Sequence, residues 1–235
     1  TAIFSIVNAV LLKPLPYHEP NQHVLVASTN RDGKLNAMST LDFIDYRDQS
    51  TSFAGMAAFD PATFNITGNS MEPTRVRGAR VGASFFELMG APMQLGRGFA
   101  AGEDQPNAQR AVVLSDGLWR GKYAADRRVV GQQIRLDGET YTVVGVAPRD
   151  FNFPARVEAF VPFVFEADQT DPQNRGSHSH MAIGRVKNGI SVDAASRELL
   201  TISERLAAQY PESNTNFRGK AVALQEYVVG KADTP

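Results

Sequence analysis

The chain has 235 residues, of which 43% are hydrophobic and 21% are charged, and this composition is that of a globular protein rather than a disordered or fibrous one. The 24 Lys and Arg residues almost cancel the 25 Asp and Glu residues, so the charge predicts no nucleic-acid partner. The chain contains no cysteine, which excludes disulfides, iron–sulfur clusters and zinc sites with thiolate ligands.

The first feature in chain order is an apolar stretch, residues 2–12, which is followed by Pro14 and Pro16. A membrane-spanning helix needs about 20 apolar residues, so the stretch is too short, and it lacks the pattern of a signal peptide. One hypothesis is a fragment of a hydrophobic helix whose other turns lie upstream, since the chain does not begin with Met. The other is an amphipathic core helix, whose apolar face is formed by Ile3, Ile6, Val7 and Val10.

A β-α-β unit is predicted next. Residues 24–28 have the pattern of a strand, and the segment STLDFIDYRDQ has the pattern of a helix that Ser39 caps. Asp42 takes the capping-box position of this helix. Residues 53–59 complete the unit with a second strand.

The middle of the chain alternates short helices and strands. In SFFELMGAP, Ser84 and Glu87 form the pattern of a capping box for one or two helical turns. The segment AVVLSDGLW predicts a strand that leads into a helix capped by Ser115. The segment IRLDGETYTVVGV predicts a hairpin, because Asp137 and Gly138 suit the two positive-φ positions of a type I′ turn.

A second β-α-β unit is predicted near the end. Residues 181–186 and 221–228 have strand patterns, and a helix starting at Ser191 lies between them. Pro211 ends this helix. Its apolar residues fall on one stripe, which consists of Val192, Ala195, Leu199, Ile202, Leu206 and Tyr210.

These elements together predict an α+β fold. The two β-α-β units can pair into one split sheet with both helices on the same face. The segment between them, from about Ser84 to Phe165, is predicted to be an inserted α+β subdomain that interrupts the first.

Two histidines are the first candidate site residues. His178 and His180 in SHSH could place both imidazoles on one side of a strand. Zinc sites need three or four protein ligands, however, and the only other histidines are His18 and His23. A solvated loop and strand start is therefore the favoured interpretation, and no metal is expected.

Ser115 and a glycine pair are candidates for catalysis and phosphate binding. Ser115 lies between a strand and a helix, but it lacks the preceding glycine pattern of a nucleophile elbow. Helix capping explains this serine without any chemistry. Gly96 and Gly98 in LGRGFAAG have neither the Walker spacing nor a G-x-G-x-x-G pattern, so they are interpreted as turn glycines.

Carboxylate pairs could in principle carry out acid–base chemistry. Asp42 with Asp45, and Glu103 with Asp104, are predicted to lie on exposed faces or in a polar loop, where solvated charges are the ordinary case. We therefore predict no acid–base site at either pair.

Two further groups complete the candidates. Arg75 and Arg77 would share one face of a strand and Arg80 the other, which indicates a charged edge strand rather than an anion-binding stripe. Trp119 and Tyr123 are one helical turn apart and are predicted core residues. The residues thus predict no catalytic, cofactor-binding or metal site.

Seven blocks of the chain carry a resemblance to a known family. They are FSIVNAVLLKPLPY, LDFIDYRDQSTSFAGMAAF, FNITG, EPTRVRGARVGASFFELMGAPMQLGRGF, VVLSDGLWRGKYAAD, VGQQIRLDGETYTVVGVAP and GRVKNGISVDAA. In this order the blocks resemble the extracytoplasmic core domain of MacB/FtsX-type ABC-transporter permeases, especially the duplicated permeases of acidobacteria. The likeness covers essentially the whole chain.

The resemblance implies a division of the chain. Residues 1–16 would be the end of the first transmembrane helix and its exit, and VVGKADTP would approach the second. Residues 17–83 plus 166–235 would form a discontinuous porter-like subdomain, with residues 84–165 as the inserted α+β subdomain. The two ends of the domain would lie close together at the inner membrane, on its extracytoplasmic side.

The resemblance also implies a function without catalysis or cofactor. The domain would transmit ATP-driven motion to an exported substrate or to a periplasmic adaptor protein. Its partners would be the membrane, an ATP-binding subunit, and a second copy or the other half of a duplicated chain. Two alternatives stay open: a module that binds a small ligand in the cleft between its two parts, and a hydrolase that uses Ser115 or the His178 and His180 pair.

Overall fold

The computed structural model describes residues 19–68 and 71–232, so the interpretations of residues 1–16 lie outside it. Its helices are η1 (Pro20–Gln22), α2 (Thr40–Gln49), α3 (Phe85–Leu88), α4 (Asp116–Tyr123), η2 (Arg127–Val129), η3 (Pro172–Asn174), α5 (Val192–Gln209), α6 (Pro211–Asn214) and α7 (Leu224–Ala232). Its strands are β1 (His23–Thr29), β2 (Leu35–Asn36), β3 (Met38–Ser39), β4 (Phe53–Gly68), β5 (Met71–Val81), β6 (Leu95–Gly96), β7 (Ala111–Leu114), β8 (Gln133–Leu136), β9 (Glu139–Val146), β10 (Ala159–Pro162), β11 (His178–Val186) and β12 (Arg218–Ala223).

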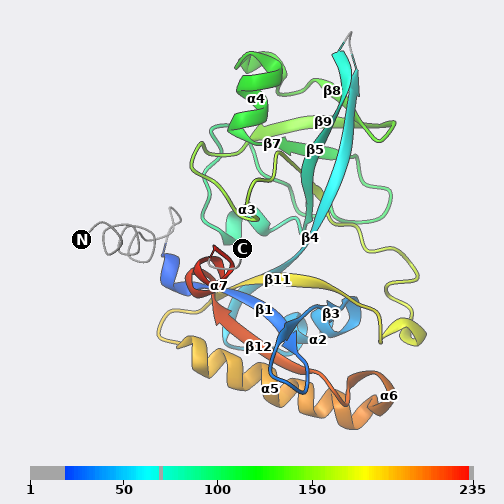
Figure 1. The fold of residues 1–235 in the computed structure, drawn as a ribbon, viewed down its shortest axis with the longest axis vertical. Coiled ribbons are helices and arrows are strands. Elements are labelled where there is room, and N and C mark those ends of the chain that lie inside the picture. Colours follow the sequence, from blue (N-terminus) through cyan, green and yellow to red (C-terminus); the bar gives the residue numbers. More distant parts are fainter. Residues whose placement is uncertain (1–18, 69–70, 233–235) are drawn as a thin grey trace.

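The two predicted β-α-β units form one sheet with the strand order β12-β1-β11-β4. All neighbouring strands in this part are antiparallel, so β1-α2-β4 and β11-α5-β12 are split β-α-β units whose strands alternate in space. Helices α2 and α5 lie together on one face of the sheet, at the lower side of the molecule (Figure 1). The α+β fold class is confirmed.

Helix α5 follows its predicted stripe. Ala195, Leu199, Ile202 and Leu206 are buried, and Val192 and Tyr210 pack at the edge of the same cluster. The Ser191 hydroxyl accepts a hydrogen bond from the amide of Ala194, which caps the helix. The sequence periodicity was sufficient here because one continuous apolar face covers the sheet.

The predicted strand at 221–228 is wrong in its second half. Strand β12 ends at Ala223, and helix α7 begins at Leu224. Leu224 is fully buried, and Tyr227, one helical turn later, packs against the same cluster. This spacing of three residues is that of a helix, and it replaces the alternation of a strand.

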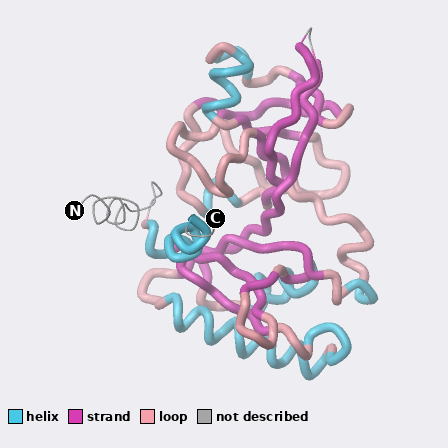
Figure 2. Tube along the Cα trace, viewed as in Figure 1, coloured by secondary structure: helices cyan, strands magenta, loops and turns pink. Residues whose placement is uncertain are grey.

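The upper part of the molecule is reached through a long hairpin. Strand β4 pairs with β11 through its first half and with β5 and β8 farther along, so it runs from the lower sheet to the top of the molecule (Figure 1). Beyond β5 the sheet continues through β10, β7, β9 and β6. Helix α4 lies at the top of this continuous sheet, α2 and α5 lie at the bottom, and α3 and α7 lie near the middle (Figure 1 and Figure 2).

Local signals in the upper part are partly confirmed. Asp137 and Gly138 have φ angles of 50° and 86°, as the predicted type I′ turn between β8 and β9 requires. The predicted capping box before α3 does not form, because Ser84 already has helical backbone angles and its side chain makes no cap hydrogen bond. A cap residue must instead have an extended backbone.

Three apolar clusters hold the layers together. The first lies between the lower sheet and helices α2 and α5, and the third lies between the upper sheet and α4. The middle cluster is rich in phenylalanine: Phe59 of β4 contacts Phe153, and Phe85 of α3 contacts Phe160 of β10. It joins the lower and upper parts by direct packing, whereas the subdomain boundaries at residues 84 and 166 stay a prediction.

The two described ends lie side by side. Helix α7 packs against η1 and against strands β1 and β12 (Figure 1). Arg185 of β11 holds the first described segment, η1, against the sheet. Its guanidinium donates to Gln22 Oε1 over 3.0 Å and pairs with Glu19. Within residues 19–68 and 71–232, no helix combines the length and apolar character that a membrane span requires.

Candidate functional site

A buried group of polar side chains lies where the chain returns from the upper part. We call Asp42, Asp45, Arg175, His178 and Asn214 the Asp42 cluster. Arg175 Nη1 donates to Asp42 Oδ1 over 2.9 Å and to Asp45 Oδ2 over 2.8 Å. Asn214 Nδ2 donates to the same Asp42 oxygen over 2.8 Å. The cluster therefore ties α2, α6 and the returning loop together.

The prediction that Asp42 is exposed is wrong. Its side chain is fully buried, and only half of the predicted capping box forms. The Asp42 amide donates to the Ser39 hydroxyl over 3.1 Å, whereas the Asp42 carboxylate accepts from Arg175 and Asn214. The covering residues are far away in the sequence: Arg175 precedes β11, and its guanidinium stacks over the Tyr210 ring at 4.1 Å. A local pattern gives no sign of such a distant partner.

The two histidines of SHSH do not share a site, and neither is solvated as predicted. The His178 ring stacks on Phe217 at 3.8 Å, and its Nε2 lies 3.6 Å from Asp42 Oδ2. The His180 ring packs edge-on against Phe163 at 4.7 Å. A register shift in β11 separates the two residues. In the described part of the chain, no three His, Asp or Glu side chains are placed to hold a metal ion.

His180 has neighbours that superficially form a Ser-His-Asp set. Its Nδ1 lies 3.8 Å from Asp60 Oδ2, and Ser179 Oγ lies 3.0 Å from Nε2 and 3.4 Å from Nδ1. Such similar distances place the hydroxyl beside both ring nitrogens, out of line with either lone pair. Burial lowers the pKa of His180 to about 4, and burial raises the pKa of Asp60. This arrangement is not that of a base activating a nucleophile.

Ser115 caps helix α4, as predicted. Its Oγ accepts a hydrogen bond from the Leu118 amide over 3.1 Å, and the following Asp116 is held by Arg120 and Gln94. These hydrogen bonds keep the pKa of Asp116 below its usual value despite the opposing effect of burial. Trp119 is buried and Tyr123 packs beside it in the upper cluster, which confirms both core predictions.

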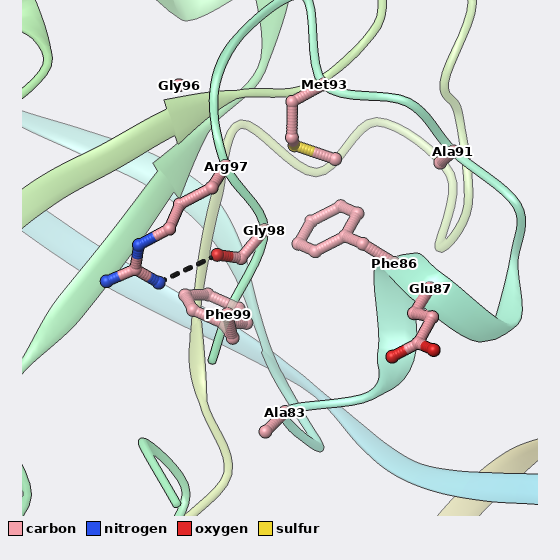
Figure 3. Close-up of a pocket in the computed structure, with 9 residues that line it drawn as sticks. All are labelled: Ala83, Phe86, Glu87, Ala91, Met93, Gly96, Arg97, Gly98 and Phe99. Carbon is pink, nitrogen blue, oxygen red and sulfur yellow. Dashed lines mark hydrogen bonds between the residues drawn. The ribbon is translucent and has the colours of Figure 1, made fainter. Parts of the chain in front are cut away.

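Gly96 and Gly98 line a cavity of about 320 Å³ beside α3 (Figure 3). Phe86, Met93 and Phe99 supply its apolar surface, whereas the Arg97 side chain turns away and donates to Gly98 O and to Glu103. Gly96 has a φ of 69°, and a Cβ there would lie 2.3 Å from Val144 O. Gly96 is thus required by its positive φ and by the close approach of β9, and its interpretation as a turn glycine is wrong, because it lies in strand β6.

A larger hollow opens between the sheet and two loops. Its volume is about 990 Å³, its floor comes from β5, β9 and β10, and its walls come from residues 103–110 and 164–170. We call it the Arg80 groove, since Arg80 of β5 lies on its floor together with Arg110 and Tyr141. It contains residues from both predicted subdomains.

The other arginines of β5 lie on the opposite face, as the strand alternation predicted. Arg75 and Arg77 are opposite Asn65 and Thr63 of β4 on the exposed side. The predicted edge strand is correct only for the outer residues, because β5 pairs with β10 from Gly78 to Val81. The Glu103 and Asp104 pair is half-buried and structural, since Glu103 binds Arg97 and Asp104 accepts from the Ala83 amide.

A comparison with family profiles gives one match. The sequence profile of the MacB-like periplasmic core domain matches residues 1–202. A comparison with curated protein sequences finds no match.

Solved structures give the same fold. The periplasmic region of MacB from Actinobacillus actinomycetemcomitans is similar with a TM-score of 0.63 and 10% identity, covering 100% of this chain and 99% of that one. A domain of a putative permease from Porphyromonas gingivalis has a TM-score of 0.62 and 12% identity, over 88% of this chain and 92% of that one. The extracellular domain of the noncanonic ABC-type transporter YknZ from Gram-positive bacteria has a TM-score of 0.56 and 11% identity, over 85% and 99%.

Proposed function

This chain belongs to the MacB-like periplasmic core domain family, and we propose that it transmits ATP-driven motion from membrane helices to an exported substrate or a periplasmic partner. It does so without catalysis, as a domain of an ABC-transporter permease on the extracytoplasmic side of the inner membrane. A mechanical role needs two conformations with different contacts, and it needs no reactive side chain.

The observation that carries this proposal is the position of the two ends. Strand β1 follows η1, strand β12 precedes α7, and these strands pair with each other over six residues from Val24 to Thr29. Membrane helices attached at the two ends would therefore act on neighbouring strands of one sheet. Their relative movement would displace the lower sheet as a unit.

The sheet offers a direct route to the far end of the molecule. Strand β4 has 16 residues and spans about 50 Å at the usual rise per residue. The first half of β4 pairs with β11 in the lower sheet, and its last residues pair with β8 at the top of the molecule. Between these two regions, the phenylalanine cluster packs the lower and upper parts together. A densely packed connection of this kind moves with little internal change.

The proposal includes partners beyond this chain. They are the transmembrane helices, an ATP-binding subunit that supplies the free energy, a second copy or the other half of a duplicated chain, and a periplasmic adaptor protein. The family membership and the adjacent ends support the first two, and the likeness to permease domains supports the others by analogy.

The test uses the full-length permease in lipid nanodiscs with its ATP-binding subunit. The chain contains no cysteine, so Arg127→Cys in η2 supplies a unique labelling position within it. Energy transfer from a fluorophore at this position to an acceptor on the lipid headgroups reports the height of the upper part above the membrane. We expect the transfer to change when ATP and vanadate trap the bound state.

Two controls separate transmitted motion from internal rearrangement. The double variant Arg127→Cys and Glu204→Cys, with spin labels on η2 and α5, is expected to keep its distance in both nucleotide states. An ATP-binding subunit unable to bind ATP should abolish the change in energy transfer. Identical transfer with and without ATP in the active complex would overturn the proposal.

A second candidate function, capture of a small ligand, is favoured by one observation. The Arg80 groove lies between the two predicted subdomains and has the volume of a small-molecule site. The chemistry of its floor and walls decides which ligand it would take.

A further inference from the structure

The floor of the Arg80 groove presents two cations near one hydroxyl. Arg80 of β5, Arg110 just before β7, and Tyr141 of β9 all line the groove, and the charges of both arginines act on the Tyr141 hydroxyl. Burial raises the pKa of Tyr141, and the positive charges of Arg110 and Arg80 oppose this rise. Glu139 and Asp137 act in the opposite direction, each more weakly than either arginine, and the phenol hydroxyl donates to no other described side chain.

These cations are available to a ligand. The Arg80 side chain makes no hydrogen bond or ion pair with the described residues, although Asp60, its partner across the β4–β5 ladder, is close enough for the two charges to interact. Arg110 pairs with Glu139 over 3.1 Å, but both side chains are more than half exposed. Exposed pairs of this kind contribute about 0–1 kcal/mol, so a ligand can exchange with Glu139 at little cost.

Most acidic groups at the groove are already engaged. Glu103 accepts from Arg97 and from the Ala100 amide, and Asp104 accepts from the Ala83 amide over 2.9 Å. Glu166 stands at the exposed rim. Together with Asp60 and Glu139, it keeps the field of the two arginines modest. Such a field suits a singly charged carboxylate better than a doubly charged phosphate.

The wall beside the cations is apolar and firmly packed. Val164 and Phe165 line it, and the Phe165 ring contacts Phe163 at 4.9 Å and Phe43 of α2 at 5.9 Å. Anchored aromatic rings give a ligand contact area at a low entropic cost. The groove thus combines an apolar wall with a small number of polar groups, as ligand sites usually do.

We propose that the Arg80 groove binds small amphipathic carboxylic acids. The carboxylate lies between the guanidinium groups of Arg80 and Arg110 and accepts from the Tyr141 hydroxyl, and the apolar body rests on the Phe165 wall. Guanidinium groups are suited to this role because their planar donors match the two oxygens of a carboxylate. This inference is independent of the proposed motion, since binding needs no nucleotide.

The test is isothermal titration of the 235-residue chain with 4-phenylbutyrate. The alcohol 4-phenylbutan-1-ol has the same apolar body without the charge and serves as the control ligand. We expect the acid to bind at least tenfold more tightly than the alcohol. Arg80→Gln and Arg110→Gln should each weaken the acid about tenfold, as expected for a lost charge-assisted hydrogen bond.

Matched variants keep the test specific. Arg75→Gln removes an exposed arginine from the opposite face and should leave the affinity unchanged. Glu166→Gln should tighten binding of the acid, because it removes a repelling charge from the rim. Each variant is checked for an unchanged melting temperature. If Arg80→Gln or Arg110→Gln does not fold, Tyr141→Phe takes its place in the titration, and it should weaken binding of the acid.

Three results would overturn the proposal. They are no binding of the acid at millimolar concentration, equal binding of the acid and the alcohol, and an equal loss of affinity in the Arg75 and Arg80 variants. Nucleotide-dependent energy transfer in the full-length permease would be unaffected by any of these results, so the two proposals fail separately.

Discussion

The Arg175 guanidinium and the Asp42 carboxylate meet over 2.9 Å, with side-chain exposures of 10% and 0%. They join α2 to the loop that returns from the upper part, across 133 positions of the sequence. Asp42 Oδ2, Arg175 Nε and His178 Nε2 are all buried without a hydrogen-bond partner among the described residues. A pair in such surroundings depends on both members being present.

Removal of the Asp42 carboxylate is therefore expected to destabilise the fold strongly. Asp42→Ala leaves Arg175 and Asn214 without the oxygen that both of them bind. Breaking a buried charge pair costs about 3–5 kcal/mol of unfolding free energy. Urea titration followed by circular dichroism measures this loss as a lower transition midpoint.

Asp45→Ala is the matched control for this measurement. Asp45 binds the same guanidinium, but its side chain is 23% exposed and water can replace it. We expect a loss of about 1 kcal/mol or less. Equal losses in the two variants would show that burial of Asp42 does not govern the stability of the cluster.

The pH dependence of stability is expected to report His180. Burial lowers the pKa of its imidazole from 6.5 to about 4, so the unfolded chain takes up a proton at a higher pH than the folded chain. The stabilisation is therefore fully present above pH 6.5 and is lost as the pH falls toward 4. The loss between pH 7 and pH 5 amounts to about 2 kcal/mol.

His180→Phe removes this titration and keeps an aromatic ring beside Phe163. The other histidines and Asp60 are present in both proteins, so the difference between them isolates His180. The difference between the urea midpoints at pH 7 and pH 5 should be smaller in the variant than in the parent chain. Parallel loss of stability in both proteins would contradict the neutral state of the buried imidazole.

The fold was predictable where local and tertiary signals coincide. The stripe of α5, the cap at Ser115 and the turn at Asp137 and Gly138 are each specified within a few residues, and all were found. The same holds for the order of the two β-α-β units. The error at Leu224 arose because a strand and a helix meet there without a glycine or proline between them.

The candidate sites were less predictable because their partners are distant in the sequence. The sequence predicts an exposed Asp42, since nothing nearby indicates that Arg175 covers it. Arg80 and Arg110 come from strands that the sequence alone could not place side by side. The alternation of β5 did indicate that Arg80 faces away from Arg75 and Arg77, and this was the one available signal for the groove.

Ser115→Ala tests whether Ser115 caps helix α4 or acts as a nucleophile, the two roles considered for it from the sequence. The variant loses the hydrogen bond to the Leu118 amide, so we expect about 1 kcal/mol of destabilisation. Ser115→Asp retains an acceptor and should restore most of the stability. Hydrolysis of p-nitrophenyl acetate should be at the background rate for all three proteins, and serine-dependent turnover would revive the hydrolase alternative.

Gly145 is expected to tolerate no side chain, because β6 crosses it closely. A Cβ at this position would lie 2.2 Å from Arg97 O and 3.0 Å from Leu95 O, and both are backbone atoms that cannot turn aside. Gly145→Ala should therefore cost about 1–3 kcal/mol, as overpacking in a core does. Loss of the β6–β9 pairing would appear as faster amide exchange at Gln94 and Arg97, whose amides donate to Val146 O and Val144 O.

Gly121 in α4 provides the opposite case in the same part of the molecule. A Cβ there meets no atom within 4 Å, and the backbone is helical. Gly121→Ala should stabilise the chain by about 0.5–1 kcal/mol, because alanine loses less backbone entropy in a helix. Thermal unfolding of both variants beside the parent chain should thus shift the midpoint in opposite directions. A stabilising Gly145→Ala would mean that β6 does not approach β9 as closely as described.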